Sequence, residues 1–541
     1  MEYTRYYWLN QDSRKFLSRG YLDEEPEQRI RDIANIAEKY LGMPGFAAKF
    51  ESYMAKGFYS LSTPVWINFG KRKGLPISCY GSNVDDTLDS ILNAGREVGM
   101  MSKYGGGTSA YLGNIRPRGS EISTGGYADG PVHYARIYDT VVDVCKQSAA
   151  RRGACAVYLP VEHKDIDEFL DIGTEGNPIQ GLQYGVTVTD AWLKSMKAGS
   201  KEKRKIWAKI IQHRNEFGFP YIMFYDNSNN NTPYKDLGYK ITASNLCSEI
   251  QLPTDSFNSF VCCLGSINLL HWDEIVETDA IEVYTQFLNA VMDEFIQKAE
   301  FMAGMKRAWR FAQQHRAIGV GALGYHSYLQ SKLIEFESME AKMINTKVFK
   351  TLKERTEAAS RWLHDAKGYK SIREGYANTT LMAIAPTKSS SFIHGAVSMG
   401  IEPIKSNYFI KDLAKSKTIY KNPFLIEELD KYGLNNKETW ESILKKDGSV
   451  QHLDFPTKAV FKSFIEISPK EVVIQAAARQ KYIDQSQSLN LMIDPSVPAK
   501  DINQLYLFAH EQGVKTLYYQ FSQSSAQAFA RNILECASCE G

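Results

Sequence analysis

The sequence predicts an α/β protein, because short β-like runs alternate with helical stretches along most of its length. The β-like runs are rich in branched and aromatic residues, as at 156–159 and 185–188. The helical stretches are longer, at 190–215, 280–305 and 345–367. No internal repeat and no low-complexity linker divides this region, so we expect one large α/β domain.

The chain is expected to have three parts. Residues 1–60 are predicted to be a small helical region, because apolar residues recur there with a 3.6-residue period. These residues are Ile30, Ile33, Ile36 and Ala37. Residues 61–520 carry the α/β core. Residues 521–541 are rich in Ser, Gln and Ala and end in two cysteines, which predicts a flexible tail whose tip visits another site.

Composition indicates a globular protein without a strong overall field. The 541 residues are 43% hydrophobic, enough for a substantial core, and 64 Lys plus Arg against 62 Asp plus Glu give a formal net charge of +2. We therefore expect no binding to nucleic acid or membrane. No run approaches the roughly 20 apolar residues that span a bilayer, and no signal peptide is present, so we expect a cytoplasmic protein, in the host cytoplasm if viral. Its eight cysteines are then available for redox chemistry.

The segment 245–249, Asn-Leu-Cys-Ser-Glu, carries the strongest chemical signal. If it is extended, Asn245, Cys247 and Glu249 project to the same side, so an amide, a thiol and a carboxylate face one small substrate. A zinc-binding thiol usually has a second cysteine at close spacing, which is missing here. The pattern favours a reaction centre, and the alternative is a buried cysteine in a turn.

Other motifs accompany this segment in order over nearly the whole chain. They lie at residues 9–14, 62–64, 78–79, 84–90, 152–154, 262–269, 386–391, 400–403, 515–519 and 536–539. With them the chain resembles the large, catalytic subunit of class I ribonucleotide reductase, whose radical-bearing loop carries Asn-x-Cys-x-Glu. The resemblance implies a ten-stranded α/β barrel of two five-stranded halves, with that finger loop threaded through its centre. Relatives usually begin with an ATP-binding helical cone. Here the family's Leu-Asn-x-Asp-Ser segment begins at Leu9, so we expect the cone to be lacking.

The resemblance also implies roles for the residues of the loop. Cys247 becomes the thiyl radical that takes the 3′ hydrogen of a ribonucleoside diphosphate, Glu249 is the base on the 3′-hydroxyl, and Asn245 orients the ribose hydroxyls. The 2′-hydroxyl leaves as water, and the product is the 2′-deoxyribonucleoside diphosphate.

Loss of the hydroxyl needs a proton and two electrons, which a cysteine pair can supply by forming a disulfide. By resemblance this pair is Cys79 and Cys262, which must lie within roughly 7 Å of each other at Cα. Cys263 directly follows and makes the assignment ambiguous by one place. The spacing to Leu264 and Asn268 favours Cys262.

Two further motifs are expected to supply electrons and the radical. Cys536-x-x-Cys539 suits thiol–disulfide exchange and is expected to re-reduce the central pair, with thioredoxin or glutaredoxin as its own reductant. A zinc site there needs two more ligands, and the tail offers none. Tyr518-Tyr519 resembles the class I radical relay, with Tyr519 nearer a radical-generating small subunit and Tyr518 nearer Cys247. Two aromatics in a β run are the alternative.

Nucleotides are expected at two sites. By resemblance the substrate diphosphate is bound by hydroxyl-bearing residues and a glycine, namely Thr63, Ser78, Gly107, Thr387, Ser389 and Ser390. Lys388 departs from relatives, and its role stays open. A specificity site for dNTP or ATP is expected at Asp86 and Arg116, with Arg152 in the loop that reports to the substrate base. Such a site lies at a dimer interface in this family, so an effector-promoted homodimer is expected.

Two other interpretations remain at this point. Gly319-x-Gly321-x-x-Gly324 fits a dinucleotide fingerprint, but a helical pattern precedes it, which disfavours that reading. No histidine pair with metal-ligand spacing is present, so no protein-bound metal is expected. The competing functions are a cobalamin-dependent (class II) ribonucleotide reductase and a non-catalytic nucleotide-binding regulatory paralogue.

Overall fold

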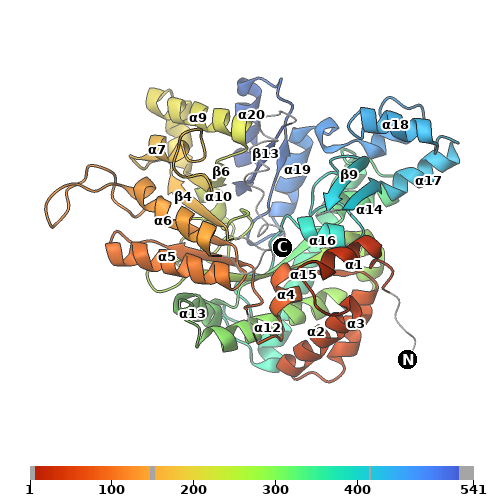
Figure 1. Ribbon diagram of the computed structural model, residues 1–541, viewed down its shortest axis with the longest axis horizontal. Helices are drawn as coiled ribbons and strands as arrows, with labels where there is room; N and C mark the ends of the chain where they lie inside the picture. The colour runs from red at the N-terminus through yellow and green to blue at the C-terminus, as the bar shows by residue number, and fades with distance from the viewer. Residues whose placement is uncertain (1–5, 73, 146–152, 414–415, 523–541) are drawn as a thin grey trace.

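The computed structural model describes residues 6–72, 74–145, 153–413 and 416–522, and its centre is a curled sheet of nine strands within those ranges (Figure 1). Five neighbouring strands, β2 to β6, are parallel, and β12 closes this half antiparallel to β6. Their bounds are β2 Cys79–Asn83, β3 Thr108–Tyr111, β4 Cys155–Pro160, β5 Gln183–Val188, β6 Tyr221–Phe224 and β12 Thr516–Leu517.

The second half of the barrel is organised around β7. This strand is antiparallel to β2 and β1 and parallel to β8. Isolated bridges from Val320 to Met382 and from Ile384 to Gln487 continue the parallel pairing beyond β8. The bounds are β1 Tyr59–Leu61, β7 Phe260–Asn268 and β8 Ile318–Leu323. The predicted α/β barrel is thus confirmed, with its second half partly built from bridges rather than full strands.

Helices cover the outside of the sheet (Figure 1). The longest are α12 Ala280–Ala299 and α15 Met339–Lys367, which pack against each other. The other helices of the barrel are α4 Thr63–Asn68, α5 Leu88–Lys103, α6 Pro131–Val144, α7 Ile166–Leu170, α8 Asp190–Lys197, α9 Lys201–Phe217, α10 Tyr225–Asn230, α11 Trp272–Ile275, α13 Lys306–His315, α14 Tyr325–Ser331, α16 Lys388–Ile393, α19 Pro469–Gln480 and α20 Ala499–Glu511.

The N-terminal region is helical, as its periodicity predicts. Its helices are α1 Gln11–Ser18, α2 Pro26–Leu41 and α3 Phe46–Ala55. Ile30, Ile33 and Ala37 are fully buried, whereas Ile36 is only half-buried. The expected single helix over 190–215 is wrong, because Ser200 caps a new helix, α9, through its side chain.

A small unit with its own apolar core projects from the barrel (Figure 1). It contains the hairpin β9 Tyr408–Leu413 and β10 Ser416–Lys421, and the helices α17 Pro423–Lys431 and α18 Lys437–Lys445. Its core residues include Leu425, Leu429, Trp440, Ile443 and Phe461. Composition did not predict this second core, because no linker sets it apart from the barrel.

The core extends slightly beyond its expected C-terminal end. Phe521 lies in β13 Gln520–Phe521, which pairs with β11 Leu491–Met492, so the core extends past the expected end at residue 520.

Gly319 and Gly321 lie within β8, where an added Cβ would meet Leu264 or Ala383, so these glycines serve strand packing. Among the residues described, no helix has the length and apolar character needed to cross a bilayer.

Candidate active site

The segment 245–249 forms a tight turn, so the extended conformation that would project Asn245, Cys247 and Glu249 to one side does not occur. Ser248 has a φ of 66° and its N–H approaches the Asn245 carbonyl at 3.4 Å. Surrounding elements bind the loop through its carbonyl oxygens. Tyr158 in β4 donates to the Asn245 carbonyl (2.7 Å), Ser488 to the Cys247 carbonyl (2.6 Å), and Thr516 in β12 to the Ser248 carbonyl (2.9 Å). Contacts from several sides thus hold the loop inside the barrel.

The carboxylate of Glu249 lies in the same buried space. Ser488 Oγ donates to its Oε2 at 3.2 Å, and only 1% of the residue is exposed. Burial raises the pKa of Glu249 to about 7, although hydrogen bonds from Asn245 and Ser488 favour the charged form. A carboxyl with this pKa can accept and return a proton near neutral pH.

Cys79 and Cys262 lie directly opposite each other on antiparallel strands β2 and β7. Opposite residues in such a pair are about 4.5–5.5 Å apart at Cα, within the range of about 4.4–6.8 Å that a disulfide spans. Both are free thiols in this structure. Asn245 Nδ2 donates to Cys79 Sγ at 3.5 Å, so the pair lies beside the 245–249 loop.

Cys263 faces away from this pair. Side chains alternate along a strand, so consecutive residues of β7 point to opposite faces of the sheet. Cys263 pairs along the backbone with Ile318 of β8, and its thiol lies near Tyr284 on the helix side. The ambiguity between adjacent thiols therefore has a geometric answer that favours Cys262.

The hydroxyl-bearing residues expected around a diphosphate are all buried. Thr387 has a φ of 53° and precedes the short helix α16, and its Oγ1 accepts from the Gly400 N–H at 2.7 Å. Gly107 forms a bridge with Cys79, and an added Cβ would lie 2.8 Å from the Leu246 side chain. The others, Thr63, Ser78, Ser389 and Ser390, are each 5% exposed.

The tyrosine pair directly follows β12, and its two rings are tilted against each other at 58°. The ring centroids of Tyr518 and Tyr519 are 4.4 Å apart, and Tyr221 from β6 lies 4.8 Å and 5.2 Å from them. Tyr518 is buried and Tyr519 half-buried, so the pair leads from the interior toward the surface. The Tyr518 N–H donates to the Leu489 carbonyl, and the preceding residue, Ser488, bonds to the 245–249 loop.

The expected effector residues bind each other in this structure. Arg116 donates through Nε to Asp86 Oδ2 at 2.7 Å and through its backbone N–H to Oδ1 at 3.1 Å. Both side chains are about one-third exposed. Arg152, Cys536 and Cys539 lie outside the described residues.

The segment 484–488, Asp-Gln-Ser-Gln-Ser, supports the site but was missed by motif reading. Ser486 N–H donates to the Glu249 carbonyl at 2.8 Å, Ser488 binds the loop as described, and Gln485 Nε2 donates to Cys262 Sγ at 3.5 Å. The available signal was a dense polar run ahead of the apolar 489–493 segment, in a buried part of the core.

Fold and site together define an oxidoreductase barrel that holds a buried loop thiol and, in contact with the Asn245 amide of that loop, a cysteine pair able to close a disulfide. Comparison with known proteins identifies the family. The model of the ribonucleotide reductase barrel domain matches residues 77–203, 194–372 and 369–520. The chain therefore belongs to the ribonucleotide reductase large-subunit family, and it is a class I member active in deoxyribonucleotide synthesis.

Individual relatives match over almost their full length. The solved structure of the Actinobacillus ureae class Id ribonucleotide reductase alpha subunit is 53% identical, with a TM-score of 0.91, over 98% of this chain and 99% of that one. The putative ribonucleoside-diphosphate reductase large subunit of Frog virus 3 is 31% identical over 94% of each chain. The ribonucleoside-diphosphate reductase large subunit of Invertebrate iridescent virus 3 is 31% identical over 97% of each.

Proposed function

We propose that this chain reduces ribonucleoside diphosphates to 2′-deoxyribonucleoside diphosphates by thiyl-radical chemistry, with a separate small subunit as the radical source. The observation that carries the proposal is the register of β2 and β7, which sets Cys79 opposite Cys262 beside the Cys247 loop. In the net reaction two S–H bonds are lost and one S–S bond forms. One hydrogen replaces the hydroxyl on C2′, and the other leaves with that hydroxyl as water.

Within this reaction Cys247 abstracts the 3′ hydrogen and returns it at the end of the cycle. Glu249 takes the proton of the 3′-hydroxyl, which its raised pKa supports. Asn245 orients the ribose hydroxyls through its amide, and the same amide reaches Cys79. The buried loop excludes water, which protects a radical intermediate from side reactions.

The diphosphate is bound by Thr387, Ser389 and Ser390, with Thr63, Ser78 and Gly107 completing the pocket. The burial of these hydroxyls near the Cys79 strand supports this assignment. Lys388 lines a cavity of about 610 Å³ together with Lys405 and Lys421, so cationic side chains gather next to the hydroxyl-bearing segment 387–391. Such charge is suited to a polyanionic group.

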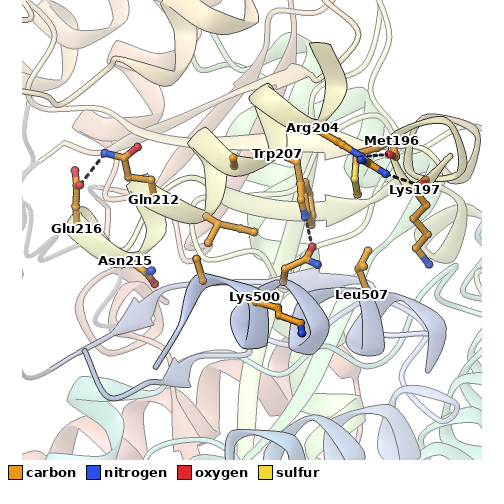
Figure 2. Close-up of a pocket in the computed structure, with 13 residues that line it drawn as sticks. Met196, Lys197, Arg204, Trp207, Gln212, Asn215, Glu216, Lys500 and Leu507 are labelled. Atoms are coloured by element: carbon orange, nitrogen blue, oxygen red, sulfur yellow. Dashed lines mark hydrogen bonds between the residues drawn. The ribbon is translucent and has the colours of Figure 1, made fainter. Parts of the chain in front are cut away.

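The radical enters through Tyr519 and then Tyr518. Figure 2 shows a cavity of about 690 Å³ between α9 and α20, lined by apolar groups such as Trp207 and Leu507. Asn215 at its edge bonds to the side chain of Gln520, the residue after Tyr519. An apolar groove whose edge residue bonds to the neighbour of Tyr519 supports docking of the small subunit there. Leu507→Glu is expected to weaken binding of that subunit in sedimentation experiments.

A deoxynucleotide or ATP effector binds at Asp86 and Arg116 and promotes a homodimer. Because these side chains pair with each other here, the effector must share or replace their ion pair. The exposed Leu88 and Leu92 on α5 are consistent with a dimer surface nearby. Analytical ultracentrifugation with and without effector tests the dimer, and a monomer under all conditions contradicts it.

The tail pair Cys536 and Cys539 carries electrons from thioredoxin or glutaredoxin to the central disulfide. Changing both to Ser is expected to leave one product per active site from pre-reduced enzyme and to stop thioredoxin-driven turnover. A small dithiol restores cycling. Cys262→Ser is expected to abolish even the first clean turnover, whereas Cys263→Ser is expected to keep it. The reverse result assigns the role of the second thiol to Cys263.

The deciding experiment is turnover of cytidine diphosphate by the chain alone, with a metal-loaded small subunit, or with adenosylcobalamin. Product only with the small subunit supports the proposal. Product with adenosylcobalamin alone identifies a class II enzyme, which the Tyr518–Tyr519 pair disfavours. No product under any condition, with nucleotide binding retained, identifies a regulatory paralogue.

A further inference from the structure

Gln485 is a fully buried side chain that bonds directly to one thiol of the central pair. Its Nε2 donates to Cys262 Sγ at 3.5 Å and to the Ile318 carbonyl at 3.0 Å, while its Oε1 accepts from the Gln251 N–H at 3.1 Å. The backbone carbonyl of Gln485 accepts from Lys515 Nζ at 2.7 Å. The side chain is therefore held in place from β7, β8 and the segment that follows the radical loop.

Each thiol of the pair accepts one amide N–H at 3.5 Å, Cys79 from Asn245 and Cys262 from Gln485, and the two differ instead in how far they can be approached. Cys79 retains 8% of its surface, whereas Cys262 retains none. Thiol–disulfide exchange needs a thiolate to reach one sulfur in line with the bond that breaks. Cys79 is thus the more exposed residue of the two, and attack at its sulfur makes Cys262 Sγ the atom that departs.

We propose that Gln485 is a positioning residue that makes Cys262 the leaving sulfur when the Cys79–Cys262 disulfide is reduced, so that attack occurs at Cys79. The role of this disulfide in catalysis rests on the proposed function, whereas its reduction by a thiolate does not. The attacking thiolate forms a new S–S bond to Cys79 Sγ as the bond to Cys262 breaks. The electron pair stays on Cys262 Sγ, which becomes a thiolate and then takes a proton.

Charge on the departing sulfur explains why a donor is needed at this position. Burial raises the pKa of Cys262 well above its usual range, and the hydrogen bond from Gln485 opposes that shift. A lower pKa of the leaving thiol speeds exchange. Among the contacts described for Cys262 Sγ, the donor is the Gln485 amide, whereas the ammonium group of Lys515 bonds to the backbone carbonyl of Gln485. The amide N–H therefore provides the local stabilisation.

The test uses the full chain with Cys536→Ser and Cys539→Ser, oxidised with diamide so that no turnover is needed. A brief reaction with 2-mercaptoethanol is quenched with acid, free thiols are alkylated, and the mixed disulfides are identified by peptide mass spectrometry. We expect 2-mercaptoethanol on Cys79 and the alkyl group on Cys262. Mixed disulfide mainly on Cys262 overturns the proposal, and this measurement needs no change at Gln485.

Gln485→Met then tests the amide itself. We expect exchange at Cys79 to slow by roughly tenfold, the effect of one hydrogen bond to a charged group, and the preference for Cys79 to weaken. Gln487→Met is the matched control, because Gln487 is equally buried two residues away and bonds to Ala476, Gln480 and Arg479 rather than to a thiol.

The two variants separate a specific role from a structural one. Equal slowing in Gln485→Met and Gln487→Met, at similar thermal midpoints, contradicts a specific role. Because diamide forms the disulfide, a chain that fails to reduce cytidine diphosphate but still reacts at Cys79 refutes the proposed function and leaves this inference standing.

Discussion

Two segments of the interior, the loop 245–249 and the start of α16 at 387–391, share one backbone device but are supported in different ways. Each contains a non-glycine residue in the left-handed region, Ser248 at φ 66° and Thr387 at φ 53°. The first loop is held through its backbone carbonyls, which accept from side chains of other elements, as in the bond from Tyr158 to the Asn245 carbonyl. The second is held through its hydroxyls, since Thr387 Oγ1 accepts from Gly400 N–H and Ser391 Oγ donates to the Val397 carbonyl.

In the proposed reaction the difference follows from what each segment offers to the substrate. There the loop 245–249 performs radical chemistry and needs its side chains at the substrate, so its carbonyls take the supporting bonds. A loop that cradles phosphate can use backbone N–H groups and some of its hydroxyls, so other hydroxyls can fix its shape. Left-handed residues cost roughly 1–3 kcal/mol each, which these supporting bonds offset. Substitutions in the two loops should therefore change different kinetic constants.

The largest effect is expected from Cys247→Ser, because hydrogen abstraction requires the sulfur at this position. Turnover should be abolished, while substrate binding, measured by calorimetry, stays nearly unchanged. Measurable reduction by the Ser variant shows that the loop is not the radical site and removes the basis of the comparison.

Glu249→Gln is expected to lower kcat by roughly 10² to 10⁴, the usual contribution of a general base. Because burial raises the pKa of Glu249 to about 7, the carboxylate is lost as pH falls through that value. The wild-type rate should therefore drop about tenfold per pH unit below 7. The pH–rate profile of Glu249→Gln should lack this fall in rate below pH 7. If the fall persists unchanged in that variant, the titrating group is another residue.

Ser488→Ala should lower kcat by about tenfold, because it removes the bonds to the Cys247 carbonyl and to Glu249. KM should change little. Ser360→Ala, at a buried serine that bonds to Asn378, provides the control for general destabilisation. A rise in KM without a change in kcat would place Ser488 with the phosphate loop instead.

Thr387→Val should have the smallest effect, a rise in KM for the diphosphate of several-fold with kcat nearly kept. The isosteric change removes the acceptor of the Gly400 N–H and one candidate phosphate ligand. Thr356→Val, within α15, is the control, since its hydroxyl bonds only locally to the Lys353 carbonyl among the contacts described. If kcat falls as much as in Ser488→Ala, the two loops are not separate in function.

Motif order along the chain predicted the family and the fold class. The α/β barrel and the helices of residues 11–55 agree with that reading. Local pattern was less reliable where neighbours decide the backbone. The 245–249 loop is a turn and not a strand, because bonds from Tyr158 and Thr516 replace the ladder that an extended segment would need.

The sequence by itself determined the reactive residue types, because thiols, carboxylates and amides at fixed spacing carry their chemistry wherever they lie. Only the tertiary structure decided which of them touch. Cys79 and Cys262 are 183 positions apart, and strand register alone brings Cys262 rather than Cys263 to the pair. Gln485 and the Asp86–Arg116 ion pair likewise depend on packing between distant segments. Such contacts arise from the summed burial of a whole core, which no local run of residues encodes.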